Sequence, residues 1–458
     1  MKNPTMAIIV GGGPAPGING VIGSAAIEAI NNGLNVIGIY DGFSRLVGQQ
    51  FDPRKDIVDL TIENMSRIHF DGGSVLRTAR ASLLDERNLD DSAPVRPDPA
   101  RVARVVDRLG SVGVTHLLTI GGDDTALSAR FVSEGSGDRI RVVHVPKTID
   151  NDLPLPGDIP TFGFVTARHL GAQVVANLME DSRTTRRWYL VVTMGRKAGF
   201  LALGIGKAAG ATLTLIPEEF PESVTISDIA DIIEGSILKR IVHGRPDGVA
   251  VLAEGLAERL IASEELTHLL GREVPVDAAG HPRLSEIPLA RILKDEIERR
   301  FNARNQKITV VGHTLGYELR CAPPTPADMS YTRDLGHGAV RLLLDQRSDL
   351  PPGVMVTIQD SNLVPVPFED LVDPETNRTR IRQVNLSSYT YHVARAYMIR
   401  LEMDDFENME MLDALAQEAG LTPDQFRARY EPTIRATLFD ADRGSSTAAV
   451  DESVCPCA

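Results

Sequence analysis

The chain has 458 residues, of which 43% are hydrophobic and 24% charged, a composition typical of a folded protein with two or three domains. Its 48 Lys and Arg residues against 62 Asp and Glu give a formal net charge of −14, which excludes a general attraction to nucleic acid or anionic lipid. We therefore expect small-molecule substrates, with no nucleic-acid partner and no membrane partner. The apolar stretch at residues 7–10 is too short for a signal sequence or a membrane span, so we expect a cytoplasmic protein.

In chain order, apolar strand-like runs alternate with helical patterns, and most of the runs lead into Gly or Asp. This alternation is typical of the α/β class with parallel sheets. The expected strands are residues 5–10, 35–40, 115–120, 141–145, 188–193, 212–216, 248–253 and 308–311. A parallel sheet binds ligands at the carboxyl ends of its strands, so the residues that follow these runs form the candidate site.

Two glycine-rich turns follow expected strands. Residues 11–19, Gly-Gly-Gly-Pro-Ala-Pro-Gly-Ile-Asn, let backbone amides approach phosphate oxygens, although they match neither the dinucleotide fingerprint nor a Walker A loop. Residues 121–125, Gly-Gly-Asp-Asp-Thr, add two carboxylates. Acids that face phosphate need a cation, so we expect Asp123 to bind Mg²⁺. An acidic first helical turn also explains Asp124, but it leaves the double glycine unexplained.

A third turn, residues 146–152, reads Pro-Lys-Thr-Ile-Asp-Asn-Asp and offers a cation, a hydroxyl and two acids. A carboxylate in this position can accept the proton of a substrate hydroxyl, as the catalytic acid of phosphoryl transfer does. Arginines at other strand ends and glycine turns favour an anion site, because the guanidinium donates two parallel hydrogen bonds to phosphate. These arginines are Arg77, Arg80, Arg187, Arg196 and Arg320.

Zinc and serine-nucleophile chemistry have no support in the sequence. None of the ten histidines lies in a His-Glu-x-x-His pattern, and no Gly-x-Ser-x-Gly turn occurs. The three cysteines are too few for a disulfide framework, so we expect reduced thiols. Cys455 and Cys457 lack a second pair of metal ligands, which favours an untied tail.

Six motifs, taken in order, resemble those of the phosphofructokinase family. They are residues 11–19, 121–125, 146–152, Met-Gly-Arg-Lys-Ala-Gly at 194–199, Ala-Glu-Gly at 253–255 and Leu-Gly-Tyr-Glu-Leu-Arg at 315–320. The likeness runs from about residue 5 to about residue 340 and is greatest to the pyrophosphate-dependent branch. It implies reversible, Mg²⁺-dependent phosphoryl transfer from diphosphate to the 1-hydroxyl of fructose 6-phosphate, a step of glycolysis or gluconeogenesis.

The resemblance also implies two Rossmann-like three-layer α/β/α domains with mostly parallel sheets and the active site in the cleft between them. We expect the donor domain at residues 1–160 with about 318–385, and the sugar-phosphate domain at 161–317. From about residue 385 the pattern turns helical, which gives a helical extension at 386–441 and a tail at 442–458 without apolar periodicity. The acid-rich stretch within that extension, from Glu402 to Asp413, is typical of a solvated helix face.

Site roles follow from the resemblance position by position. Asp150 matches the general base and Asp123 the Mg²⁺-linked acid. The donor-binding positions are Gly13, Arg80, Asp124 and Lys147. The substrate-binding positions are Thr148, Arg187, Met194, Gly195, Arg196, Glu254, Tyr317 and Arg320. Arg187 is expected to come from a neighbouring subunit, which implies a homo-oligomer, either a dimer or a tetramer.

Donor choice depends on two positions. ATP users of the family commonly have Gly where Asp124 stands, and its carboxylate would repel the α-phosphate of a nucleotide. Lys147 can neutralise the short, highly charged pyrophosphate, but it is the weaker clue because some ATP users also carry Lys there. An ATP-dependent 6-phosphofructokinase is the first alternative. A Gly-Gly-Asp type nucleotide or lipid kinase shares only the second motif, and the Asp123/Asp150 pair argues against a silent sugar-phosphate sensor.

The chain departs from the family pattern in two places. Val311 stands where bacterial members carry a second subunit-bridging arginine for the sugar 6-phosphate, and Tyr317 replaces the usual His. Lys307 is a candidate to bind that phosphate in place of the arginine. A different acceptor, such as sedoheptulose 7-phosphate, therefore stays open. Gly23 and Ile27 stand where allosteric bacterial enzymes place effector-binding arginines, so we expect weak or absent effector control.

Overall fold

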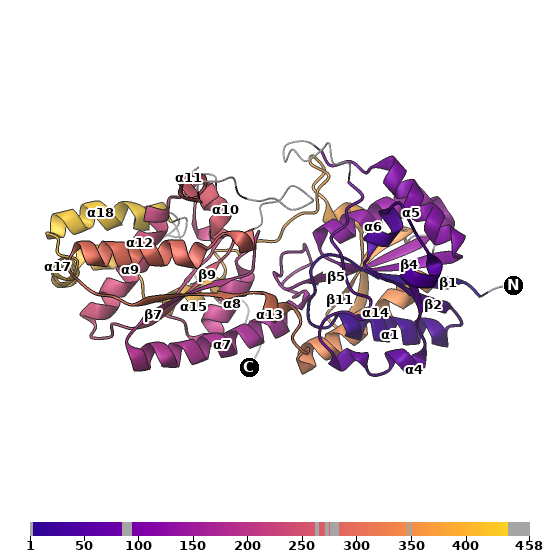
Figure 1. The fold of residues 1–458 in the computed structure, drawn as a ribbon, viewed down its shortest axis with the longest axis horizontal. Helices are drawn as coiled ribbons and strands as arrows, with labels where there is room; N and C mark the ends of the chain where they lie inside the picture. Colours follow the sequence, from indigo (N-terminus) through magenta and orange to yellow (C-terminus); the bar gives the residue numbers. More distant parts are fainter. Residues whose placement is uncertain are drawn as a thin grey trace, which may run out of the picture.

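The computed structural model describes residues 3–84, 94–261, 265–270, 274, 284–345, 347 and 350–437. The predicted tail, with Cys455 and Cys457, lies outside the described residues. The chain forms two α/β units, one built around an eight-stranded sheet and the other around a four-stranded sheet, which form the two lobes of Figure 1.

The first unit contains a sheet in the order β12-β11-β5-β4-β1-β2-β3, with the short β6 paired to β5. Its strands are β1 Thr5–Val10, β2 Asn35–Ile39, β3 Ile57–Asp59, β4 Val114–Gly121, β5 Arg141–Thr148, β6 Phe162–Gly163, β11 Gly353–Gln359 and β12 Asn362–Pro367. The central strands are parallel, whereas β3 and β12 are antiparallel to their neighbours at the two edges. The carboxyl ends of β1, β4 and β5 therefore lie side by side.

Helices cover both faces of this sheet because its strands alternate their buried side chains. In β1, Met6 and Ile8 pack with α1 and α14, whereas Ala7 and Ile9 pack with α5 and α6. The helices of the unit are α1 Ile18–Asn31, α2 Phe43–Val47, α3 Pro53–Asp56, α4 Ile62–Met65, α5 Pro99–Ser111, α6 Asp123–Ser136 and α14 Pro326–Leu344. Short 3₁₀ turns occupy Ile68–Phe70 (η1), Gly137–Arg139 (η3) and Phe368–Leu371 (η6).

The second unit contains a fully parallel sheet in the order β10-β7-β9-β8. Its strands are β7 Trp188–Thr193, β8 Leu213–Leu215, β9 Gly248–Ala253 and β10 Val310–Leu315. Its helices are α7 Phe164–Thr185, α8 Phe200–Ala209, α9 Ile226–Val242, α10 Leu256–Ile261, α11 Glu265–Leu270, α12 Leu289–Ala303 and α13 Tyr317–Arg320. Short 3₁₀ turns occupy Pro217–Glu219 (η4) and Leu284–Glu286 (η5).

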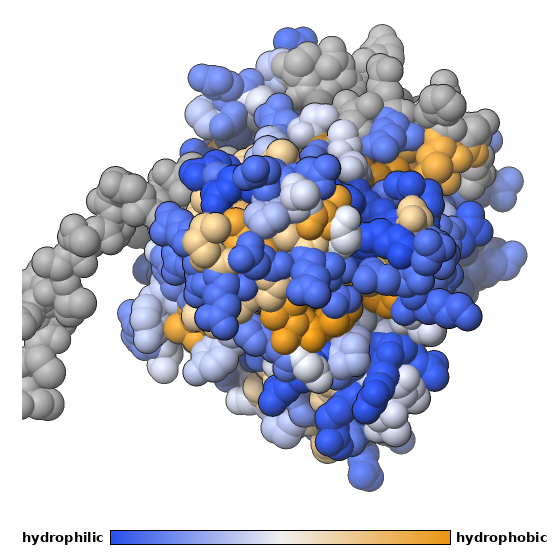
Figure 2. Space-filling model, turned by 90° about the vertical axis from the view of Figure 1, so that its left-hand side faces the viewer, coloured by the Kyte–Doolittle hydropathy of each residue, from blue (hydrophilic) through white to orange (hydrophobic). Residues whose placement is uncertain are grey.

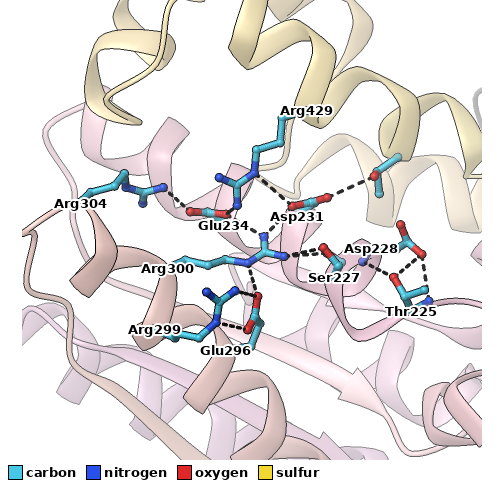
Figure 3. A network of polar contacts seen from close by, with 11 residues as sticks. Thr225, Ser227, Asp228, Asp231, Glu234, Glu296, Arg299, Arg300, Arg304 and Arg429 are labelled. Carbon is cyan, nitrogen blue, oxygen red and sulfur yellow. Dashed lines mark hydrogen bonds and ion pairs between the residues drawn. The ribbon is translucent and has the colours of Figure 1, made fainter. Parts of the chain in front are cut away.

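The C-terminal helices belong to the core of the second unit. They are α15 Tyr389–Ala396, α16 Met403–Glu407, α17 Met409–Glu418 and α18 Pro423–Ala436. Phe406, Phe426 and Tyr430 pack in one apolar cluster with α9 and α12. A charged cluster fastens α18 as well: Arg429 reaches Glu234 of α9, which also bonds Arg300 and Arg304 (Figure 3). We call this cluster, residues 231, 234, 296, 300, 304 and 429, the helix anchor.

The chain passes between the units three times, after β6, after β10 and after η6. The second unit is therefore an insertion in the first, followed by a return of the C-terminal helices to it (Figure 1). Viewed from the end that carries α17, hydrophobic areas of the surface are separated by hydrophilic ones (Figure 2). Within the described ranges, no helix is both long and apolar enough to span a bilayer.

The fold prediction is confirmed: the class is α/β, the sheets are mostly parallel and the C-terminal region is helical. The prediction for the acid-rich stretch is wrong at one position, because Asp405 is buried and bonds Lys239 at 2.6 Å. Glu402 is also paired, with Arg395. The stretch therefore contributes ion pairs to the packing of α16 rather than only a solvated face.

Candidate active site

Three turns of the first unit meet at the carboxyl ends of β1, β4 and β5. The amide of Gly11 donates to the carbonyl of Ile120 at 2.9 Å, which joins the first two turns. A Cβ on Gly11 or on Gly121 would lie 2.4 Å from Oγ1 of Thr125, so only glycine fits at both positions. The two glycine-rich turns are thus packed against the start of α6, where backbone amides are available to an anion.

Lys147 lies beneath the first glycine turn. Its side chain is buried, 4% exposed, and its ammonium donates to the carbonyl oxygen of Gly13. Arg320 approaches the same glycine from α13, with its guanidinium carbon 3.4 Å from the position of a Cβ on Gly13. Burial and the charge of Arg320 lower the pKa of Lys147 to about 8. Two cations therefore flank the turn that is expected to hold the donor phosphates.

Asp150 lies at the end of the third turn. Its backbone amide donates to Oγ1 of Thr148 at 3.0 Å, which fixes the turn that carries the carboxylate. Burial raises the pKa of Asp150 to about 6, with a further increase from Glu254 that Arg320 and Arg196 oppose. A carboxylate with a pKa in this range accepts a proton more readily than an exposed one and is still ionised at neutral pH.

Asp123 begins α6 and faces the second unit. One carboxylate oxygen accepts the amide of Asp124 at 2.9 Å, and the other lies 3.3 Å from the ammonium of Lys197. Asp152 lies two residues after Asp150 in the third turn. Burial and the charges of Asp150 and Asp123 raise the pKa of Asp152 to about 7. These acids repel one another, which a bound cation would relieve.

The carboxylates of Asp123 and Asp152 are suitable ligands for a hard cation that keeps most of its bound water. Among the described residues, no group of three or more His, Cys, Asp or Glu side chains forms a complete metal cage. Mg²⁺ needs no such cage, because one or two carboxylates, water and phosphate oxygens fill its coordination sphere. The chemistry of Asp123 and Asp152 therefore fits Mg²⁺ brought together with a phosphate ligand.

The second unit adds the loops that follow β7 and β9. Met194, Gly195 and Arg196 follow β7, and the amide of Gly195 donates to the carboxylate of Glu254 at 3.4 Å. Gly195 has a φ of 127°, and a Cβ there would lie 2.8 Å from the carbonyl oxygen of Ala198. Glycine is therefore required where this loop turns. Burial raises the pKa of Glu254, against the opposing effect of the Gly195 amide and Arg196.

Tyr317 and Arg320 occupy α13, which leads from the second unit back to the first. The phenol ring of Tyr317 is 65% exposed, and the guanidinium of Arg320 lies 5.3 Å from the ring centre. Because Arg320 also approaches Gly13, its charge acts on Lys147, Asp150 and Glu254 alike. One arginine thus joins the expected donor and sugar positions.

The comparison with known proteins fits this arrangement. The pattern of the phosphofructokinase family matches residues 5–343, about three quarters of the chain. The chain belongs to the phosphofructokinase family. The prediction of the family is therefore confirmed, and the motifs that led to it all lie within the matched residues.

Two relatives align with this phosphofructokinase over most of its length. It is 53% identical over 425 residues to the pyrophosphate–fructose 6-phosphate 1-phosphotransferase of Thermotoga maritima, which covers 93% of this chain and 97% of that protein. It is 50% identical over 437 residues to the protein of the same name from Naegleria fowleri, covering 93% and 95%. The crystal structure of a pyrophosphate-dependent phosphofructokinase from Marinobacter aquaeolei superimposes with a TM-score of 0.60 at 15% identity, over 94% of this chain and 91% of that one, which shows the shared fold.

Two further predicted residues are Arg80, which is at the surface, and Arg187, which precedes β7. Arg80 is exposed, but its neighbour Ala79 accepts the amide of Gly12 at 3.1 Å, so it follows a segment that lies against the first glycine turn. Arg187 precedes β7, whereas Met194 follows it; the six residues of the strand separate them by about 20 Å. A single chain does not bring Arg187 to Met194.

Sequence reasoning gave no role to Lys197, Asp152 or Arg382. Lys197 lies in the Met-Gly-Arg-Lys-Ala-Gly motif, directly after Arg196. A second cation at this strand end could have indicated a further residue of an anion site. Asp152 was visible as the second acid of its turn. Arg382 lies outside every motif, and only the structure places it against Asn151.

A separate hollow of about 340 Å³ lies between α1, η1 and α14. It contains Gly23 and Ile27, the positions from which weak effector control is expected. Its other lining residues include His69, Arg333 and His337. No candidate site residue lines this hollow, and the expectation of weak effector control stays a prediction.

Proposed function

We propose that this phosphofructokinase transfers a phosphoryl group from pyrophosphate to the 1-hydroxyl of fructose 6-phosphate, giving fructose 1,6-bisphosphate and phosphate. The observation that carries the proposal is the placement of Asp124 at the start of α6 together with buried Lys147 beside Gly13. Two relatives that bear this activity in their names, at 53% and 50% identity, support it.

In the proposed reaction, Asp150 accepts the proton of the sugar hydroxyl while the hydroxyl oxygen bonds the transferring phosphorus. The bridging P–O bond of pyrophosphate breaks at the same time, and phosphate leaves. Lys147, Arg320 and the amides of the first glycine turn offset the charge on the phosphate oxygens, as a loose transition state requires.

Asp123, with Asp152 nearby, would hold Mg²⁺. The bound ion supplies positive charge to the phosphate oxygens. The sugar phosphate would lie against Met194, Gly195, Arg196 and Glu254, with Thr148 and Tyr317 at its sides. We further propose a homo-oligomer, because Arg187 reaches a site only if a neighbouring copy presents it.

A donor and acceptor comparison tests the function. Purified protein receives Mg²⁺ and fructose 6-phosphate with pyrophosphate, ATP or ADP at equal concentration, and fructose 1,6-bisphosphate is measured. We expect turnover with pyrophosphate at least about 10²-fold above that with ATP, because Asp124 repels a nucleotide α-phosphate. Removal of Mg²⁺ with a chelator should abolish it.

The roles of the two positions in donor choice are tested with the double variant Asp124→Gly with Lys147→Gly. It should lose pyrophosphate turnover by at least about 10-fold and bind ATP more readily, because the repelling carboxylate is gone. Turnover of the native protein with ATP alone would overturn the donor assignment. Turnover with sedoheptulose 7-phosphate but not fructose 6-phosphate would overturn the acceptor assignment.

A further inference from the structure

A segment beyond the family pattern lies against both walls of the candidate site. The pattern ends at residue 343, whereas residues 379–384, the linking segment, run from the first unit toward α15 in the second. The hydroxyl of Thr379 donates to the carbonyl oxygen of Asp123 at 3.3 Å. The amide of Val384 donates to Glu218 at 3.0 Å. The linking segment thus bonds the turn that carries Asp123 at one end and the second unit at the other.

Arg382, in the middle of the linking segment, bonds the turn that carries Asp150. Its Nε donates to the carbonyl oxygen of Asn151 at 3.1 Å, and another guanidinium nitrogen donates to the side-chain oxygen of the same residue. The third nitrogen donates to the carbonyl oxygen of Ile159 at 2.9 Å. The backbone amide of Arg382 adds a bond to the carbonyl oxygen of Asp152 at 2.8 Å.

Asn151 has a turn conformation that its side-chain hydrogen bonds hold in place. Its φ is 58°, in the left-handed region that asparagine adopts more readily than other residues with a Cβ, and its side chain is buried. The side-chain oxygen also accepts the amide of Thr161 at 3.0 Å. The bonds to Arg382 and Thr161 therefore help to hold Asn151 in this turn conformation. Since Asn151 follows Asp150 directly, the bonds that hold Asn151 also fix the backbone on the C-terminal side of Asp150.

The other end of the linking segment fixes the sugar-side loop. The carboxylate of Glu218, 7% exposed, accepts both the amide of Gly199 at 2.8 Å and the amide of Val384 at 3.0 Å. Gly199 closes the loop that contains Met194 and Arg196. The guanidinium of Arg382 also lies 5.4 Å from the ring centre of Phe200, the residue that follows Gly199.

We propose that Arg382 is a positioning residue for Asp150, and that the linking segment sets the spacing between the proton-accepting turn and the sugar-side loop. Arg382 holds Asn151 and Asp152, the two residues that follow Asp150, and thereby fixes the turn from which the Asp150 carboxylate reaches the acceptor hydroxyl. The inference rests on the proposed function, since it assigns a role in the same phosphoryl transfer.

The test compares Arg382→Met and Arg382→Lys with Arg108→Met. Arg108 is a matched control, because its guanidinium also bonds backbone carbonyls, those of residues 45, 46, 48 and 49, and also lies near a phenylalanine ring, that of Phe51. None of these is a candidate site residue. Pyrophosphate-dependent kcat and KM for fructose 6-phosphate are measured, together with Tm and amide hydrogen exchange.

We expect Arg382→Met to lower kcat about 10²-fold while KM stays within about twofold, because a misplaced base slows chemistry more than binding. Arg382→Lys, which keeps the charge but not the fork, should recover part of the loss. Amides of residues 149–161 should exchange faster in Arg382→Met only. Arg108→Met should keep native kcat and native exchange in that region.

Each outcome decides one question. Native kcat in both Arg382 variants, with an active native protein, overturns the positioning role. Equal loss in Arg382→Met and Arg108→Met, in step with Tm, shows a stability effect and also overturns it. Should Arg382→Met fail to fold, the kcat and exchange of Arg382→Lys decide in its place. A native protein that turns over no substrate defeats the proposed function instead, and the exchange result then still reports whether Arg382 holds the turn.

Discussion

The candidate active site and the helix anchor are built from the same residue types but balance their charges differently. In the anchor, Arg300 bonds Asp231 at 2.5 Å, Glu234 at 2.8 Å and Glu296 at 2.6 Å (Figure 3). Burial would raise the pKa of Glu234, but Arg429, Arg304 and Arg300 together lower it. In the active site, burial outweighs the nearby cations and raises the pKa of Asp150.

The pKa values of buried acids distinguish a structural charge cluster from a functional one. The anchor pairs its carboxylates with arginines of the same chain, which lowers the pKa of Glu234 and Glu296, although burial still raises the pKa of Asp231. In the active site, burial and neighbouring carboxylates outweigh the nearby cations, so the pKa values of Asp150 and Asp152 are about 6 and about 7. The two clusters should therefore respond in opposite ways to substitution.

The largest expected effect is that of Asp150→Asn. The amide cannot accept the hydroxyl proton, so kcat should fall about 10²–10⁴-fold with little change in KM for fructose 6-phosphate. Steady-state kinetics with pyrophosphate measure this. Near-native turnover would remove Asp150 from the mechanism. The variant should fold as well as the native protein, because a buried acid of raised pKa is replaced by a neutral group.

Arg300→Met should break the anchor and reverse that pattern. Loss of the arginine leaves Asp231 and Glu234 with less compensation, which should lower the free energy of unfolding by about 3–5 kcal/mol. Urea denaturation measures the loss in the free energy of unfolding. At urea concentrations below the unfolding transition, kcat should equal that of the native protein. Arg299→Met is the matched control, because Arg299 bonds the same Glu296 as Arg300 does, but its own side chain is 67% exposed. Arg299→Met should lower the free energy of unfolding by less than about 1 kcal/mol. An equal loss in Arg299→Met and Arg300→Met would contradict the stabilising role of the helix anchor.

The smallest expected effect is the pH dependence of Asp152→Asn. The pKa of Asp152 in the folded protein is about 7, above its ordinary value of 3.8, so the folded state binds the proton more tightly than the unfolded state. The stabilisation is complete below about pH 4 and is lost as the pH rises through 7. Asp152→Asn should therefore be more stable than the native protein at pH 8, by on the order of 1–3 kcal/mol, and should approach it near pH 4. Denaturation curves at both pH values test the sign.

The sequence predicted the parts of the fold and site that depend on local pattern. The strand expected at 115–120 is β4, Val114–Gly121, and the strand at 141–145 opens β5. Both lead directly into the turns that carry Asp123 and Asp150. Hydrophobic runs and glycine turns are short-range signals, so a reading of single segments finds them.

The remaining features depend on contacts between distant segments. β11 and β12 were not predicted, although the sequence of Gly353–Gln359 is a mainly apolar run. Arg382 bonds Asn151 across 231 positions of sequence, and Asp405 pairs with Lys239 across 166. A single arginine or aspartate in the sequence gives no indication of its partner, so the linking segment and the buried Asp405 appear only in three dimensions.

The repeated passage of the chain between the units has a consequence for truncation. A fragment that ended with α14 would resemble a complete family domain, yet it would lose β11 from the edge of β5, where Gly353 pairs with Val142. The fragment would also lack Phe406 and Phe426, which pack in the apolar core of the second unit. An open strand edge and a bared apolar face both promote aggregation. Such a fragment should therefore precipitate, because each lobe is finished only by the last quarter of the chain.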